Sequence, residues 1–235
     1  TCGGYMEGIQ ASFINIVGQD SDGIQMGFVN TTGGKAKAGQ LGFINTVKDI
    51  EGMQTGFVNT SDNLKGTQLG FVNSADQLDG FQLGFINTAD TLKGGVPLGF
   101  ISIVKNGGFN AIRMSMTEMH PFNLSYKLGI KKLYTSFNFS FNPLHDNHFA
   151  LGLGLGTILP FHKSFYFNPE IISQSAIRDN PHQYLSFTAN FGYQFTENFH
   201  ILGGPSFTWN YSDFNSDVFE KPFLSFYSHK YNLKI

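Results

Sequence analysis

Apolar and polar positions follow one short pattern through the first half of the chain. Residues 68–73 read Gln-Leu-Gly-Phe-Val-Asn, and residues 82–87 read Gln-Leu-Gly-Phe-Ile-Asn. The copies, spaced by 15, 15, 14, 14, 14 and 15 residues, begin at Gln10, Gln25, Gln40, Gln54, Gln68, Gln82 and Pro97. Every copy has a Phe followed by a β-branched residue, and all but the last then have an Asn. A fixed short period is typical of stacked structural units.

Each copy predicts a strand, a polar turn, a shorter second strand and a Gly bend. Fourteen residues are too few for two packed helices, and Gly, Val, Phe and Asn form helices poorly. We therefore expect residues 1–107 to form a β-solenoid with one turn per copy, the turns lying about 4.8 Å apart. An antiparallel meander, with one hairpin per copy, would also fit the length.

In a solenoid each side chain lies over its counterpart in the next turn, so identical residues can stack or hydrogen-bond in ladders. The predicted ladder residues are Phe28, Phe43, Phe57, Phe71 and Phe85; Asn30, Asn45, Asn59, Asn73 and Asn87; and Gln40, Gln54, Gln68 and Gln82. The last copy has Pro97 and Ser102 in place of Gln and Asn, which is typical of a terminal unit. We place the domain boundary near 106–108.

Residues 108–235 have longer stretches in which apolar and polar residues alternate one by one, which predicts an antiparallel β domain. We expect about eight strands, at 109–119, 122–130, 132–142, 148–161, 164–177, 183–196, 199–212 and 222–234. The overall fold class is therefore all-β, with an N-terminal solenoid and a β-barrel-like second domain.

The alternation of the second domain fits either a membrane barrel or a soluble sandwich with a Phe-rich core. The polar positions are mostly Ser, Thr, Asn, Gly and Gln, the charges gather at proposed connections, and aromatic residues flank those connections. These features favour a membrane barrel. In that case the charged residues inside strands must face the lumen; they are Arg113, Glu118, Lys127 and Glu170.

Charge is scarce in this chain. Charged residues make up 14% of the 235 residues and the net charge is −2, whereas a soluble domain has about 25% charged residues. This argues against a nucleic-acid surface, and no apolar run approaches the roughly 20 residues of a membrane helix. The single cysteine, Cys2, excludes an internal disulfide. It could carry the lipid of a bacterial lipoprotein, although Thr1 precedes it.

Few residues suggest chemistry. The run His145-Asp146-Asn147-His148 could touch a metal, and stacked Asp62, Asp76 and Asp90 could bind calcium. Solvated turns, with Lys65 and Lys93 softening the acidic charge, are the simpler interpretation. Neither a nucleophile motif nor a complete phosphate loop is present. We therefore expect no catalytic, cofactor-binding or metal residues, no cofactor, and a protein that is not an enzyme.

The stretches GTQLGFVNSADQL, GFQLGFINTADTLKG, LGFISIVKNGG and NLSYKLGIKKLYTSFNFSFN resemble a family of bacterial surface-repeat proteins. Such proteins, found in spirochaetes and Bacteroidetes, carry tandem G-x-Q-x-G-F-(V/I)-N units, often followed by a β-barrel-like region. The resemblance covers most of residues 8–142. It implies an envelope location and β structure, and it supplies no catalytic residue.

Two functions follow as expectations. The first is a non-catalytic structural or interaction protein of the bacterial outer membrane or its periplasmic or surface face. It would be an accessory or sealing subunit of a larger outer-membrane complex such as a secretion translocon, with no nucleic acid and no small-molecule substrate. The alternative is a soluble binding module whose repeat face holds a glycan or peptide, which an outward-facing row of the Phe residues would favour.

Overall fold

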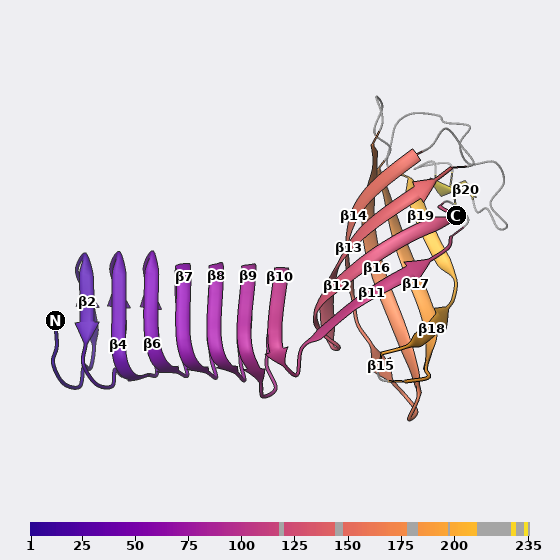
Figure 1. Cartoon of the computed structure of the whole chain (residues 1–235). Coiled ribbons are helices and arrows are strands. Elements are labelled where there is room, and N and C mark those ends of the chain that lie inside the picture. The colour runs from indigo at the N-terminus through magenta and orange to yellow at the C-terminus, as the bar shows by residue number, and fades with distance from the viewer. Residues whose placement is uncertain are drawn as a thin grey trace. The chain divides into compact units, whose positions relative to one another are not determined.

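The computed structural model describes residues 1–117, 120–143, 148–177, 183–196, 198–210, 227–228 and 233–234. The described residues are all-β (Figure 1). Among them there is no helix of the length and apolarity that a membrane crossing requires. The chain divides into two compact units, one of Thr1–Phe109 with Leu128–Ile130 and the other of Asn110–Lys127 with Lys131–Ile235.

The first unit is a β-solenoid in which each sequence copy makes one turn. Its strands are β1 (Ile9–Ala11), β2 (Ile14–Val17), β3 (Ile24–Met26), β4 (Val29–Ala36), β5 (Gly39–Leu41), β6 (Ile44–Ile50), β7 (Met53–Leu64), β8 (Thr67–Leu78), β9 (Phe81–Leu92) and β10 (Val96–Asn106). Successive turns pair in parallel and in register, so that Gln54 pairs with Gln68 and Asn59 with Asn73. The predicted solenoid is confirmed, and the antiparallel meander is excluded.

The stacking begins before the first recognisable copy of the repeat. Cys2 forms a parallel bridge with Val17, and Met6 forms one with Ser21. The backbone N–H of Cys2 donates to the Ile16 carbonyl oxygen at 2.7 Å. The solenoid therefore includes residues near the start of the sequence that carry no visible repeat, because backbone pairing does not require the repeated side chains.

The fourth, fifth and sixth turns each direct an amide pair, a small residue and an aliphatic residue inward. In the fourth turn these are Gln54, Asn59, Ser61 and Leu64, all of them buried. The small and aliphatic positions form the hydrophobic cluster of the unit, which contains Ala36, Val47, Ile50, Leu64, Ala75, Leu78 and Ala89. The interior of the solenoid is thus partly apolar and partly built of amides.

One corner of every full turn after the first is a glycine, and close packing between turns requires it. A Cβ atom on Gly70 would lie 2.4 Å from the carbonyl oxygen of Gly56 and 2.5 Å from Nδ2 of Asn59. Both distances are shorter than real Cβ contacts. A side chain at this position would have to separate the turns or displace the amide column.

The second unit is an antiparallel sheet that curls into a half-barrel (Figure 1). Its strand order is β11-β12-β13-β14-β16-β17-β18, with β15 paired to β16 and β19 paired to β17. The strands are β11 (Phe109–Ser115), β12 (Phe122–Ile130), β13 (Leu133–Asn142), β14 (His148–Gly156), β15 (Leu159–Pro160), β16 (Phe165–Ile177), β17 (Gln183–Gln194), β18 (His200–Gly203) and β19 (Ser206–Asn210). Two short strands, β20 (Tyr227–Ser228) and β21 (Leu233–Lys234), pair with each other.

Three predicted strands differ from the observed ones. The strand predicted at 109–119 ends at Ser115. The strand predicted at 148–161 is divided into β14 and β15, since the Ile158 N–H donates to the Lys131 carbonyl oxygen instead of continuing the ladder. The strand predicted at 199–212 is divided at Gly204-Pro205, where Pro205 has no N–H to donate. Most of the strand predicted at 222–234 lies outside the described residues.

We predict that Gly70→Ala destabilises the central turns of the solenoid by about 1–3 kcal/mol, the usual cost of overpacking. Hydrogen–deuterium exchange of the amides in residues 66–87 measures this as lost protection. Gly4→Ala is the matched control, because a Cβ atom there meets no atom within 4 Å. Equal protection in the two variants would contradict the close packing at this corner.

Candidate functional site

The phenylalanine column lies on the outside of the solenoid. Neighbouring rings from Phe13 to Phe100 are stacked, with centroids 4.8–5.1 Å apart and planes within 2–7° of parallel. The central rings remain exposed; Phe71, for example, is 43% exposed. Since each ring face is covered by the next ring, the column presents ring edges to the outside.

The asparagine column is buried and fully connected along the stack. Asn59 Nδ2 donates to Asn73 Oδ1 at 2.9 Å, and Asn73 Nδ2 donates to Asn87 Oδ1 at 2.9 Å. The same Asn73 nitrogen also donates to the Leu83 carbonyl oxygen at 3.0 Å. Every turn from Asn15 to Asn73 repeats this arrangement, so each amide satisfies a donor or acceptor of the next turn.

The glutamine column runs in the opposite direction. Gln68 Nε2 donates back to Gln54 Oε1 at 2.8 Å, and it also donates to the Ser74 carbonyl oxygen. The column ends at the seventh turn, because Pro97 replaces the next glutamine and cannot donate. Gln82 Oε1 is accordingly buried without a hydrogen-bond partner within the part of the chain that the structure describes.

Beside the phenylalanine column, three further columns point outward and are largely apolar. We call these four columns together the apolar face of the solenoid. In the fourth turn the face consists of Met53, Thr55, Phe57 and Val58. None of the equivalent residues in the other turns, all of which lie in the described range 1–117, carries a charge.

The charges of the solenoid lie at other positions, and some of them form short-range pairs. Lys105 Nζ lies 2.6 Å from Asp90 Oδ1, and this hydrogen bond raises the pKa of Lys105. Lys37 Nζ lies 3.0 Å from Asp22 Oδ2, and the hydrogen bond that it donates is the main cause of the lowered pKa of Asp22. The stacked acidic residues Asp62, Asp76 and Asp90 end at Lys105, which lies over Asp90 in the next turn and forms an ion pair with it. The described residues contain no cluster of three metal-ligating side chains.

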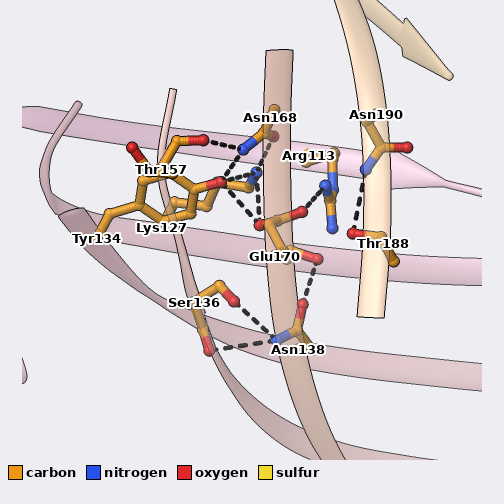
Figure 2. Close-up of polar contacts among 11 residues, drawn as sticks. Arg113, Lys127, Tyr134, Ser136, Asn138, Thr157, Asn168, Glu170, Thr188 and Asn190 are labelled. Carbon is orange, nitrogen blue, oxygen red and sulfur yellow. Dashed lines mark hydrogen bonds and ion pairs between the residues drawn. The ribbon is translucent and has the colours of Figure 1, made fainter. Parts of the chain in front are cut away.

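The concave face of the second unit holds a buried ion cluster, which Figure 2 shows. The carboxylate of Glu170 on β16 pairs with Arg113 on β11 and, at 2.9 Å, with Lys127 on β12. Tyr134 on β13 donates its hydroxyl proton to Glu170 Oε1 at 3.0 Å. Asn168 accepts from Lys127 Nζ at 3.3 Å and donates to the Thr157 carbonyl oxygen at 2.7 Å. Four strands are thus tied together by one carboxylate and its neighbours.

Other polar side chains continue this face. Ser125 Oγ donates to Asn138 Oδ1 at 2.7 Å, and Asn138 Nδ2 donates to Ser136 Oγ at 3.0 Å. Across the sheet, Ser186 and Thr208 hydroxyls lie 2.9 Å apart. The buried residues of the second unit are therefore mainly polar and hydrogen-bonded to one another.

The convex face of the same sheet has the opposite character. Its outward residues are large, apolar and exposed on every long strand; Leu153 in the middle of β14 is 43% exposed. The exposed set includes Ile112, Met114, Phe122, Leu124, Tyr126, Phe139, Phe149, Leu151, Leu153, Leu155, Phe165, Ile171, Ile177, Phe191, Tyr193 and Phe207. We call these residues the convex apolar band. A sheet with polar residues inside and apolar residues outside is inverted relative to a soluble domain.

The charge pattern of the sequence singled out the three ionic members of this cluster but not its uncharged members, Tyr134 and Asn168. Arg113, Lys127 and Glu170 do lie on the concave face; Glu118 lies outside the described residues. Tyr134 was missed, although its position matches the polar phase of the alternation that contains Ser136 and Asn138. The run 145–147 also lies outside the described residues, and His120 is buried with Nε2 3.2 Å from the Tyr184 hydroxyl.

Comparison with protein-family models, with curated proteins and with solved structures found no match to this chain.

We predict that Asn73→Leu destabilises the solenoid by about 2–4 kcal/mol, because buried polar partners in adjacent turns lose their hydrogen bonds. Gln77→Leu in the same turn is the control, since its side chain is exposed and such changes stay within about 0.5 kcal/mol. Hydrogen exchange of residues 53–92 reports the difference. If the two variants exchange alike, the amide column contributes nothing to stability.

We also predict that Glu170→Gln costs about 3–5 kcal/mol, because it leaves Arg113 and Lys127 buried without a counter-charge. Glu51→Gln is the control: its pair with Lys35, at 2.6 Å, is partly exposed, and exposed pairs contribute little to stability. Thermal unfolding of both variants under the same solvent conditions measures the effect. A small, equal change in both would show that the buried pair does not hold the sheet together.

Proposed function

We propose that this chain is a non-catalytic structural or interaction protein of the bacterial outer membrane. The second unit would be embedded in lipid through the convex apolar band, with its strands closing into a barrel of about eight strands. The solenoid would contact a larger outer-membrane protein, as an accessory or sealing subunit of a complex such as a secretion translocon. The observation that carries this proposal is the inverted polarity of the curled sheet.

Inverted polarity has a physical cost in water. Apolar surface favours burial by about 25 cal/mol per Å², so water would oppose a sheet that turns its large apolar residues outward. Lipid tails remove that cost, and they also favour the internal satisfaction of polar groups. The concave polar cluster and the convex apolar band together fit the division between the inside and the outside of a membrane barrel.

The strand lengths support the same proposal. A tilted strand needs about 9–11 residues to cross a bilayer. β12, β13 and β14 have 9, 10 and 9 residues, and β16 and β17 have 13 and 12. Each of these five strands is therefore long enough to cross the hydrocarbon region.

Aromatic residues gather where strands of this sheet meet their connections. Phe165 packs against Tyr193, with ring centroids 4.8 Å apart, and Tyr193 packs against Phe195 at 4.7 Å. Near the opposite ends of β13 and β14, Phe141 stacks on Phe149 at 4.8 Å. Two aromatic groups at opposite strand ends resemble the paired interfacial girdles of outer-membrane barrels.

A soluble glycan-binding or peptide-binding module is the second candidate, and the exposed phenylalanine row is the observation that favours it. Sugar recognition by aromatic residues relies on open ring faces, on which the sugar ring can lie. In this column the faces are covered by neighbouring rings at 4.8–5.1 Å, which leaves the edges. The geometry therefore favours a protein partner over a glycan.

Leu153→Arg tests the membrane proposal. In lipid, an arginine in the convex apolar band costs about 2–4 kcal/mol near the midplane, so we expect less protein inserted into liposomes and less retained after a carbonate wash. Leu83→Arg is the matched control, because Leu83 is exposed to a similar extent but lies in the solenoid. Release of the unmodified protein by carbonate, or equal insertion of both variants, would rule the proposal out.

A further inference from the structure

The apolar face of the solenoid is an exposed surface that is separate from the convex apolar band proposed to contact lipid. Its stacked rings span six spacings of 4.8–5.1 Å. In each turn the face follows about 16 Å of chain, from Met53 to Val58 in the fourth turn, at the usual rise of a strand, and it bends at the glycine corner, Gly56. The face therefore measures on the order of 500 Å², which is at the upper end of the apolar patches seen on monomeric proteins. A surface of this size and regularity indicates an interaction site.

The chemistry of the face restricts what can cover it. Residues 1–109 contain nine carboxylates and six lysines, none of them on the apolar face. The surrounding negative charge opposes an anionic lipid surface, because peripheral membrane binding depends on basic residues beside the apolar ones. The face itself offers no charge by which a charged partner could be selected.

The periodicity of the face restricts the partner further. The turns present one ring edge every 4.8–5.1 Å, so a partner that contacts every turn must have the same repeat. Stacked β-strands have this spacing, and paired sheets with identical repeats can exclude water between interdigitating side chains. A second copy of this solenoid satisfies the repeat automatically, and two uncharged faces meet without repulsion.

We propose that two copies of this chain associate through the apolar faces of their solenoids, related by a two-fold axis. Such an interface is isologous, so the same patch serves on both subunits. Because each face bends at the glycine corner, two faces would bury less than about 1,000 Å², the area of a weak interface. The dimer is therefore expected to be reversible. The middle turn, which contains Phe57, would face the middle turn of the other copy whether the two stacks run parallel or antiparallel.

Cross-linking of single-cysteine variants of the full chain tests this proposal. In a Cys2→Ser background, Phe57→Cys places a thiol on the apolar face, and Asp62→Cys places one on the polar side of the same turn. We expect a short bismaleimide to convert the first variant mainly to a covalent dimer and to leave the second monomeric, although both react with a monofunctional maleimide. Equal cross-linking of the two variants, or none in either, would overturn the proposal.

A second measurement covers the possibility that Phe57→Cys disturbs the stack. The full chain with its native Phe57 is followed by sedimentation equilibrium, in detergent if it requires detergent. We expect a monomer–dimer equilibrium that Phe71→Lys weakens by about tenfold or more, as central apolar anchors typically do, while Gln77→Lys leaves it unchanged. Unaltered hydrogen exchange in both variants establishes that the solenoid is intact. A native chain that stays monomeric at about 100 μM, a concentration that would also detect a weak dimer with a micromolar dissociation constant, refutes the dimer.

Discussion

The solenoid depends on one constraint: a buried amide must be satisfied by the turn next to it. Asn59 and Asn73 are both fully buried, and each supplies what the other requires at 2.9 Å. An unpaired buried amide costs about 1–3 kcal/mol, so a change in one turn leaves groups unpaired in its neighbours. This coupling explains why the copies keep the same residue at the same position, and why glycine is required where the chain passes close to the amide column.

The second unit follows the same rule without a repeat. Lys127, Tyr134 and Glu170 come from three strands, and each would be costly to bury alone. Together they satisfy one another, and the glycines of β14 leave room for them: a Cβ atom on Gly156 would lie 2.5 Å from the Tyr134 hydroxyl. Placing large polar side chains opposite glycine is how this face holds an ion cluster without opening the sheet.

The solenoid and its columns could be predicted from the sequence, because identical residues at a fixed short period occupy equivalent positions in successive turns and lie over one another. It did not decide whether the phenylalanine column points inward or outward, since both orientations stack the rings equally well; the outward direction follows from the Gln54 and Asn59 amides occupying the interior. In the second unit, alternation predicted the long strands. The break at Ile158 depends on backbone pairing with Lys131, which a local pattern does not record. The break at Pro205 has a local cause, since proline has no N–H to donate.

Both units bury hydrogen-bonded polar side chains and expose apolar ones, although the solenoid also buries an aliphatic cluster. This shared feature has a consequence for stability. Where networks such as Asn73–Asn87 and Lys127–Glu170 are dry, their interactions are strong because the surroundings have a low dielectric. Water reaching these groups would weaken them, so an apolar exterior protects the network as well as providing a contact surface. The exposed apolar residues are thus part of the same physical arrangement as the buried amides and ions, and a lipid or protein cover over them would stabilise the interior that they enclose.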